Sequence, residues 1–320
     1  MSTQPHHVHN LTPATDPTST LEVRQNFLQD VRGRMKRIRG AIRRTVGYEN
    51  DAFNLSTNEK IEGTESYDFP TNTQKINAFV RDVKEWIEQE LIEPANFEDL
   101  RNGDHWTSEY IWAAYYIGHR GSVGKLKQNG VSATYLDPDE LLQRPKRVST
   151  LRDLYTRAYE NLTDISDDMA QTVREEVTRG FAEGENPRQI ATRLNQELEK
   201  LQRTRAETLA RTEVIHAYTE SSFDSYEEAG VDVVSHIEWK TAQDSRVCPV
   251  CMALGGKEFT ISEMRNNSVQ LLGQTYRLAP PAHPNCRGAV SPVVGGDADA
   301  LDPLDVRLPT DEDVEQFQEN

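Results

Sequence analysis

Two short stretches, Cys248-Pro249-Val250-Cys251 and His283-Pro284-Asn285-Cys286, decide how the C-terminal half of this chain folds. A gap of two residues lets both side chains of a pair reach one ion from a tight turn. Two such pairs supply the four tetrahedral ligands that zinc takes in structural sites. The pairs use all three cysteines of the chain, and the 31 residues between them are enough to fold as a β-hairpin that brings them together. We therefore predict a closed structural Zn²⁺ site with the ligands Cys248, Cys251, His283 and Cys286.

The same residues allow other interpretations. Three unrelated thiols beside a surface histidine would hold no metal. An HNH-type nuclease also combines cysteine pairs with a histidine and an asparagine, here His283 and Asn285. However, a histidine that ligates zinc is not available as a general base, and no second histidine stands beside it in the sequence. A metal-dependent nuclease is therefore kept as the alternative.

Sequence patterns on both sides of the first pair predict the fold class. Apolar spacing predicts helices over 151–162, 166–183, 187–199 and 201–229; Gly184 ends the second, and Asn186-Pro187 begins the third. Residues 231–240 predict a strand, and shorter strands are expected around 257–261, 275–278 and 287–293. The expected class is α+β and mainly α-helical, with long helices followed by a small β-rich module stapled by a structural zinc.

The N-terminal half predicts three further helices. Apolar residues recur every three or four positions over 21–46 and over 76–91, where Pro94 ends the second helix. A third helix is expected over 108–119, and no regular structure is assigned to 120–147. We divide the chain into a disordered tail (1–20), an N-terminal helical region (21–150), a module (151–295) that contains the zinc knuckle (240–293), and an acidic disordered tail (296–320).

The first helix has an unusual charge. Residues 21–49 carry eight basic and three acidic side chains, a net charge of +5, in a chain whose net charge is −16. Its apolar residues fall on one face, so the basic ones are expected on the solvent-facing sides. They would bind a polyanion, either DNA or an acidic protein partner; a solvated helix face is the alternative. The proposed polyanion-binding residues are Arg32, Arg34, Lys36, Arg37, Arg39, Arg43 and Arg44.

Charged residues also alternate along RAETLARTEV, residues 205–214. We leave two interpretations open: a solvated helix face, or a buried network that ties the long helix to the zinc module. Trp239 is expected to pack the module onto that helix. The network would contain Arg205, Glu207, Arg211, Glu213, Trp239 and Asp244.

The composition limits the function classes. A mean hydropathy of −0.72 and the lack of any long apolar run indicate no membrane-spanning segment and no signal peptide. The strongly negative net charge argues against a surface that binds nucleic acid everywhere. Basic residues are 26 Arg and 10 Lys. This acidic, lysine-poor composition suits a halophilic host, with an ordinary acidic protein as the alternative.

Several elements over residues 151–293 occur in an order that resembles the phage Mu protein F-like family of minor head (head morphogenesis) proteins. They are the turn 184–187, the helical RAETLARTEV, the break at Gly230-Val231, the strand ending in Trp239, TAQDSRVCPVCMALGGKEF (241–259) and PPAHPNCRGAVSPV (280–293). Residues 21–150 lie outside this resemblance.

The resemblance implies a structural virion protein of a tailed virus, located in the capsid interior or at the portal vertex and assembled in the host cytoplasm. It implies portal protein and major capsid protein as partners, packaged double-stranded DNA as a further candidate, and no enzymatic activity. We expect no membrane partner and no small-molecule substrate. The alternatives are the nuclease and a non-viral adaptor built on a zinc module.

Overall fold

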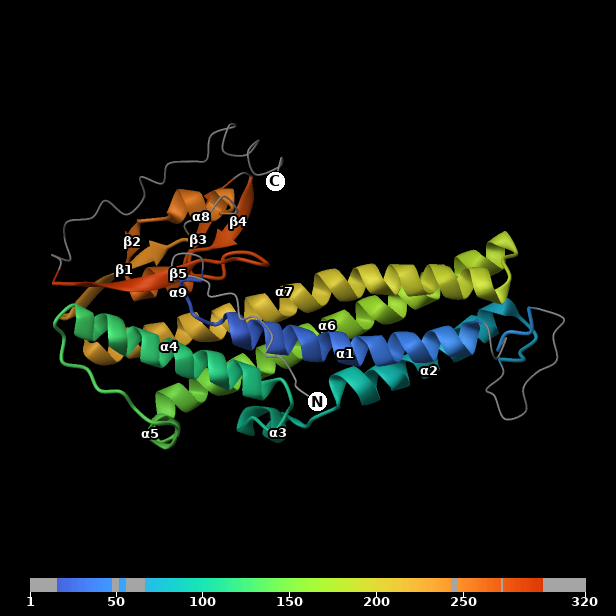
Figure 1. The fold of residues 1–320 in the computed structure, drawn as a ribbon, viewed down its shortest axis with the longest axis horizontal. Coiled ribbons are helices and arrows are strands. Elements are labelled where there is room, and N and C mark those ends of the chain that lie inside the picture. Colours follow the sequence, from blue (N-terminus) through green and yellow to red (C-terminus); the bar gives the residue numbers. More distant parts are fainter. Residues whose placement is uncertain (1–15, 48–51, 56–66, 243–246, 272, 296–320) are drawn as a thin grey trace, which may run out of the picture. The chain divides into compact units, whose positions relative to one another are not determined.

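The computed structural model describes residues 16–47, 52–55, 67–242, 247–271 and 273–295 (Figure 1). The described residues are mainly helical, with a small antiparallel sheet region near the C-terminal end, as the predicted fold class required. They form two compact units. One contains residues 25–109 and 152–210, and the other contains the described parts of 1–24, 110–151 and 211–320. The predicted tail 296–320 and Asp244 lie outside the described residues.

The unit formed by residues 25–109 and 152–210 has a helical core. It contains most of α1 (Leu21–Val46), α2 (Asn72–Ile87), the π-helix η1 (Glu88–Ile92), α3 (Phe97–Asn102) and parts of α6 and α7. Phe53 lies among three other aromatic rings, with its centroid 5.2 Å from those of Phe79 and Phe181 and 5.4 Å from that of Tyr67. The buried face of α1 matches the predicted spacing: Phe27, Val31, Met35, Ile38, Ile42 and Val46.

The first residues before α1 correct one expectation. The predicted tail does not extend to residue 20, because Asp16, Thr18 and Thr20 are buried. The Asp16 carboxylate accepts hydrogen bonds from the Leu21 backbone N–H at 3.0 Å and from Arg24 at 2.7 Å. A carboxylate at this position satisfies backbone donors that the first helical turn leaves without partners.

Two helices are much longer than predicted. Four helices were expected after residue 150, but the structure has two longer ones in their place. They are α6 (Pro145–Glu183) and α7 (Pro187–Ala229). The predicted breaks near residues 164 and 200 are wrong because neither segment contains a proline or glycine there. The predicted end of α6 and start of α7 are confirmed, and Gly184 has φ +67°, which suits a helix-ending glycine. The predicted boundary near residue 150 falls inside α6.

Residues 120–147, to which no regular structure was assigned, are largely helical. The helix expected over 108–119 is α4 (Ser108–Gln128), and α5 (Pro138–Leu142) and the start of α6 follow it. Gly121 and Gly124 belong to this unassigned segment, but both lie within α4, as does Gly118. A Cβ on Gly118 would lie 2.6 Å from the Tyr218 carbonyl oxygen. Close packing of α4 on α7 therefore outweighs the low helix propensity of glycine.

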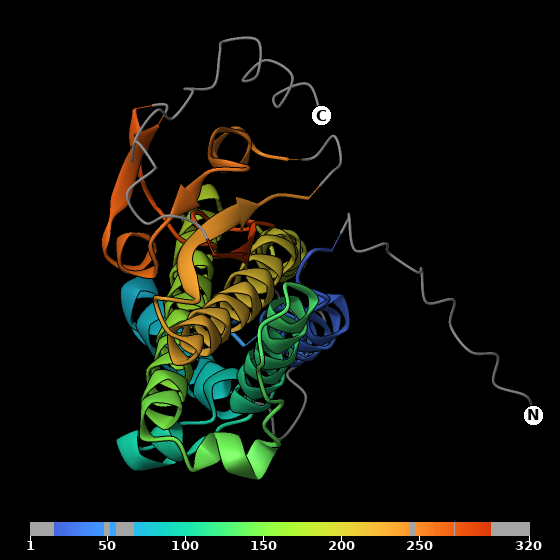
Figure 2. The same cartoon turned by 90° about the vertical axis from the view of Figure 1, so that its left-hand side faces the viewer.

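The strands follow α7 directly. β1 (Val234–Lys240) is the centre of a three-stranded antiparallel sheet, between β2 (Glu258–Phe259) and β5 (Ala289–Val294). β3 (Ser268–Leu271) and β4 (Gln274–Arg277) form a separate hairpin. The sheet packs on the C-terminal part of α7, where Phe223 and Tyr226 share one buried cluster with Ile237 and Trp239 (Figure 2).

Outside residues 120–147, the predictions missed four short elements: α3, β3, α8 (Pro249–Leu254) and α9 (Ile261–Asn266). The signal for α9 is present in the sequence as a capping box, Thr260 to Glu263, and both of its reciprocal hydrogen bonds form.

Candidate metal centre

The first cysteine pair is built by the start of α8. Cys248 is the N-cap residue of this helix, and its sulfur accepts a hydrogen bond from the Cys251 backbone N–H at 3.3 Å. Pro249 occupies the first helical position, where its missing N–H costs nothing. One helical turn therefore places the sulfurs of Cys248 and Cys251 on the same side.

The second pair lies in the loop between β4 and β5. The Cys286 N–H donates to the His283 carbonyl at 3.1 Å, which closes a turn. Asn285 has a positive φ of 63°, a conformation that asparagine tolerates better than most residues. The Gly288 N–H donates to the Cys286 sulfur at 3.4 Å. β5 pairs with β1, so the sheet brings this loop next to α8.

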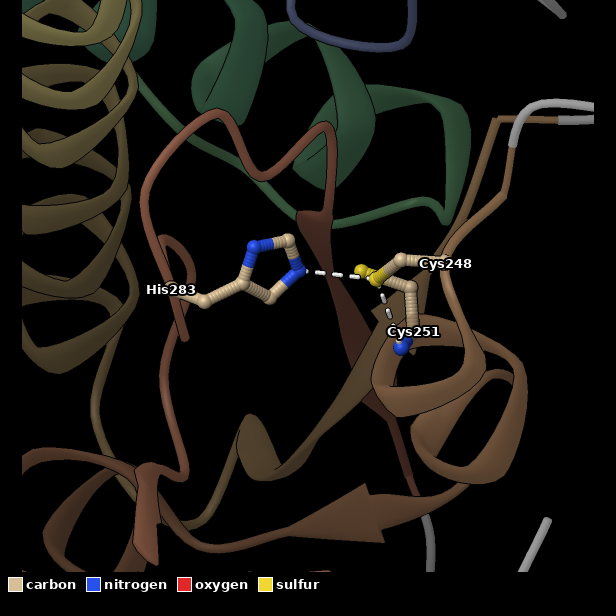
Figure 3. Close-up of side chains that lie close together, drawn as sticks. All are labelled: Cys248, Cys251 and His283. Atoms are coloured by element: carbon tan, nitrogen blue, oxygen red, sulfur yellow. Dashed lines mark hydrogen bonds between the residues drawn. The ribbon is translucent and has the colours of Figure 1, made fainter. Parts of the chain in front are cut away.

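Three of the four predicted ligands form one tight group, and the fourth lies beside it. The ligand atoms of Cys248, Cys251 and His283 all lie within 4.8 Å of one another (Figure 3). His283 Nε2 is 2.7 Å from Cys248 Sγ, and Cys286 Sγ is 3.5 Å from Cys251 Sγ. Cys286 thus joins the cluster through Cys251, although it is outside the tight group of three. Cys251 and Cys286 are buried, and Cys248 is half-buried.

The thiols and the imidazole shift one another's pKa values. Hydrogen bonding with Cys251 lowers the pKa of Cys248 to about 4 and, against the opposing effect of burial, that of Cys286 to about 7. Hydrogen bonding with Cys248 raises the pKa of Cys251 well above its ordinary value. Burial lowers the pKa of His283, but hydrogen bonding with Cys248 and the nearby sulfur charges raise it to about 9. Cys248 and Cys286 thus favour the thiolate, the form in which cysteine binds metals, whereas Cys251 favours the thiol and would release its proton on binding one.

The residues fit a zinc ion. Three sulfurs and one imidazole nitrogen form a donor set typical of structural zinc sites. The hollow beside them has a volume of about 20 Å³ and is lined by Cys248, Cys251 and His283, with Ala242, Val247, Asn285 and Arg287. A space of this size holds one ion or one water molecule, not an organic ligand. In the described part of the chain, no other cluster of three potential metal ligands occurs.

Trp239 packs against the loop that carries Cys286. Its ring is fully buried, as predicted for a packing residue, and belongs to the same buried cluster as Cys251, Cys286 and the α7 residue Phe223. A Cβ on Gly288 would lie 2.9 Å from this ring, so the loop that carries Cys286 touches the indole directly. Trp239 therefore connects the β-rich module to α7.

The structure places the members of the predicted charged network in different surroundings. Arg205 is wrong as a member: its side chain is half-exposed and pairs with Asp168 of α6 at 2.6 Å. Trp239 contributes packing alone, because its indole nitrogen has no hydrogen-bond partner among the described residues. Glu213 is buried, and Glu207 and Arg211 are half-buried. Their joint role remains a prediction.

A different ionic cluster, which the sequence did not reveal, attaches the segment between the two ligand pairs to α7. Arg265 of α9 donates to three acidic residues of α7: Glu220 at 3.1 Å, Asp224 at 3.0 Å and Glu227 at 2.7 Å. Arg277 of β4 donates to Glu220 at 2.6 Å. The acidic residues recur every three or four positions on α7, which was the available signal. We call this group the Arg265 clamp.

The Arg265 clamp is strongly ionic. Burial raises the pKa of Glu220, but its hydrogen bond with His216 and the charges of His216, Arg265 and Arg277 lower it to about 2. Asp224 is fully buried and also accepts from the Tyr115 hydroxyl at 2.6 Å.

The basic residues of α1 are less available than predicted. Arg34 stacks on Trp106, 4.1 Å from the ring centroid, and pairs with Glu93. Arg39 is mostly buried and donates to Gln202 at 3.0 Å. Arg37 is exposed but pairs with Glu90 at 2.6 Å. The prediction that all seven face solvent is therefore wrong, because acidic and polar residues of neighbouring helices use several of them. Those still exposed, without an ion pair among the described residues, are Lys36, Arg43 and Arg44.

The candidate metal site lies within a segment that matches a known protein family. Residues 171–291 match the family model described as phage Mu protein F like protein. This match supports the assignment of the segment to the Mu protein F-like family. No curated protein and no solved structure matches the chain. The Mu F-like segment begins inside α6 and ends in β5, so it contains α7, all four ligands and the Arg265 clamp.

The match is narrower than the predicted resemblance, which began at residue 151, and it leaves α1 to α5 outside. The family indicates a phage head morphogenesis protein and hence a component of the virion. No helix among the described residues has the length and apolar character needed to cross a bilayer.

Proposed function

We propose that this chain is a structural minor head protein of a tailed virus that bridges portal protein, major capsid protein and packaged DNA during head assembly and genome delivery. The match of residues 171–291 to the Mu protein F-like family carries this proposal. The chain would be assembled into the head in the host cytoplasm and remain in the capsid interior or at the portal vertex. It would act by binding and would catalyse no reaction.

We further propose that Cys248, Cys251, His283 and Cys286 hold one structural Zn²⁺. The donor set and the small hollow beside it support this assignment. Four protein ligands would fill the coordination shell and leave no position for a reacting water, so the ion would staple α8 to the β4–β5 loop. A catalytic zinc needs an open position and a nearby base.

The test is the composition of purified particles. We expect mass spectrometry of gradient-purified virions to detect the chain at a few copies per portal. We also expect a deletion of its gene to yield heads with defective DNA content or delivery. Full-titre particles that lack the chain would contradict the proposal. A plasmid-nicking assay with Mg²⁺ or Mn²⁺ tests the nuclease alternative, for which we expect no cleavage.

A further inference from the structure

A groove runs along the exposed side of α1, next to the end of α2 and the π-helix η1. Its volume is about 540 Å³, within the range of ligand sites in proteins. Both walls belong to the same compact unit. We call it the α1–α2 groove and define it by Lys36, Gly40, Ala41 and Arg44 of α1, Trp86 of α2 and Glu90 of η1.

The floor and one wall of the α1–α2 groove suit a flat group. Gly40 and Ala41 bring the α1 backbone close to the surface because they carry almost no side chain. Trp86 is half-buried and lines the groove; its ring meets Phe79 edge-on, with centroids 6.3 Å apart and planes at 76°. This contact with Phe79 restrains the indole, and we take the part of the ring that lines the groove as the surface on which a second ring would stack.

The cations of the groove suit a phosphate. Lys36 and Arg44 are exposed, and neither forms an ion pair among the described residues. The Arg44 guanidinium lies over the small floor, because a Cβ on Gly40 would be 3.4 Å from its Nη1 atom. Arg37 also lines the groove, but Glu90 neutralises it. Two cations are therefore available beside one aromatic wall.

We infer that the α1–α2 groove binds a single-stranded nucleic-acid segment, with a base stacked on Trp86 and phosphates paired with Lys36 and Arg44. Aromatic platforms beside basic side chains are the common solution for binding single strands without reading their sequence. A duplex keeps its bases stacked inside and offers only phosphates. An acidic peptide would use the two cations but would gain little from the indole. The inference takes only the class of partner, DNA, from the proposed function, and it differs from that function in requiring an unpaired strand.

The test uses the full chain and a fluorescently labelled oligothymidine of ten nucleotides. Binding is measured by fluorescence anisotropy at low salt. Arg44→Gln and Arg43→Gln form a matched pair: each removes one exposed arginine of α1, but only Arg44 lines the groove. We expect Arg44→Gln and Lys36→Gln to weaken binding several-fold and Arg43→Gln to change it by less than about twofold. Trp86→Ala is expected to weaken binding about five- to hundredfold, and Trp86→Phe to restore most of the affinity.

Three results would overturn the inference. Equal losses for the Arg43 and Arg44 variants would indicate diffuse attraction to the helix surface. A duplex of the same length that competes as well as oligothymidine would exclude base stacking. Displacement of the oligonucleotide by polyglutamate at equal charge concentration would indicate an acidic protein partner. None of these results bears on whether the chain is present in virions, so failure of the inference is distinguishable from failure of the proposed function.

Discussion

Gly118 leaves no space for a side chain at the crossing of α4 and α7. The nearest atom to an added methyl group would be the Tyr218 carbonyl oxygen, at 2.6 Å, which is backbone and cannot rotate away. We expect Gly118→Ala to reduce the free energy of unfolding by about 1–3 kcal/mol, because the helices must move apart. Urea denaturation followed by circular dichroism measures the change.

Gly124 provides the matched control on the same helix. A Cβ there would meet only the Tyr135 hydroxyl oxygen, at an ordinary 3.5 Å. Gly124→Ala should therefore be neutral or stabilise by up to about 1 kcal/mol, since alanine is the better helix former. Similar losses of stability for Gly118→Ala and Gly124→Ala would show that α4 and α7 leave room for a methyl group at Gly118.

His119 is a buried base whose protonation should weaken the fold. Its Nε2 accepts a hydrogen bond from the Leu136 N–H at 3.0 Å, so the neutral ring is the form that fits. Burial and the charge of Arg147 lower its pKa to about 4. The unfolded chain binds this proton near pH 6.5. The contribution of the neutral ring to stability is thus complete above about pH 6.5 and is lost as the pH falls toward 4.

The size of this effect follows from the shift, which corresponds to at most about 3 kcal/mol. NMR titration of His119 should give a midpoint near the lowered value. In His119→Gln, which keeps an acceptor but does not titrate, the loss of stability between pH 6.5 and 4 should be smaller. A titration midpoint near pH 6.5 would contradict the expected loss of stability on protonation of His119.

Single residues also show what the sequence could predict. Spacing alone predicted a ligand group, and the structure brings three of its members, Cys248, Cys251 and His283, together. Gly121 lies in a segment to which no regular structure was assigned, because its neighbour in space is Tyr218, about a hundred positions away in the sequence. Arg34 and Arg39 were placed in solvent for the same reason: helix periodicity gives the face of a residue but not the partner that covers it.

Among the elements, α9 depends most on one side chain. Its six residues are too few to be stable alone, and Arg265 holds them to the acidic face of α7. We expect Arg265→Met to reduce the free energy of unfolding by more than the roughly 1 kcal/mol that an exposed ion pair contributes. The cost should stay within the roughly 3–5 kcal/mol of a fully buried one. Hydrogen exchange over residues 261–277 should increase, because this segment loses its attachment.

A more exposed ion pair provides the comparison. Lys240 and Glu238 are paired on β1 with side chains that are 44% and 27% exposed, against 24% for Arg265 and 0% for Asp224. Lys240→Gln should therefore change stability by less than about 1 kcal/mol. If Arg265→Met has an effect equally small, the clamp is a surface feature and α9 is held by packing alone.

The elements that were predicted best are the long amphipathic ones and those with clear ends. α1 was predicted with its bounds because its apolar residues repeat without interruption, and the boundary between α6 and α7 because glycine and proline mark it. The false breaks within α6 and α7 came from polar residues, which do not end a helix whose other face stays buried. β3 was missed because strands of four residues carry little pattern.

For the whole molecule, the metal site should control only one of the two compact units. All four ligands lie in the unit that contains the β-strands. Structural zinc ions contribute on the order of 10 kcal/mol of apparent binding energy, comparable with the stability of a domain. We expect Cys251→Ser to abolish stoichiometric zinc and to remove hydrogen-exchange protection from residues 234–294. The apolar face of α1 should stay protected.

The neighbouring residue gives the control for this experiment. Met252 lies in the same short helix, is 46% exposed and is not a ligand. Met252→Ser should retain one zinc per chain and the wild-type exchange pattern. Metal analysis of freshly purified, reduced wild-type protein that finds no zinc would contradict the assignment, whatever the variants do.

At this scale the sequence predicted the class and the family but not how the chain is divided. Each unit combines segments that are far apart in sequence, and α6 and α7 contribute residues to both. No composition change marks such a division, because it depends on tertiary contacts. Sequence patterns can only place boundaries where the chain itself is interrupted.

The preference for arginine over lysine has a practical consequence in the α1–α2 groove. Lys36 is the only primary amine on α1, since the other seven basic residues of this helix are arginines. An oligonucleotide that carries an aldehyde at an abasic position would form an imine with a lysine amine but not with a guanidinium, and borohydride would make that bond permanent. Covalent attachment mapped to α1 would therefore identify a single atom, the Nζ of Lys36, as the neighbour of the bound strand.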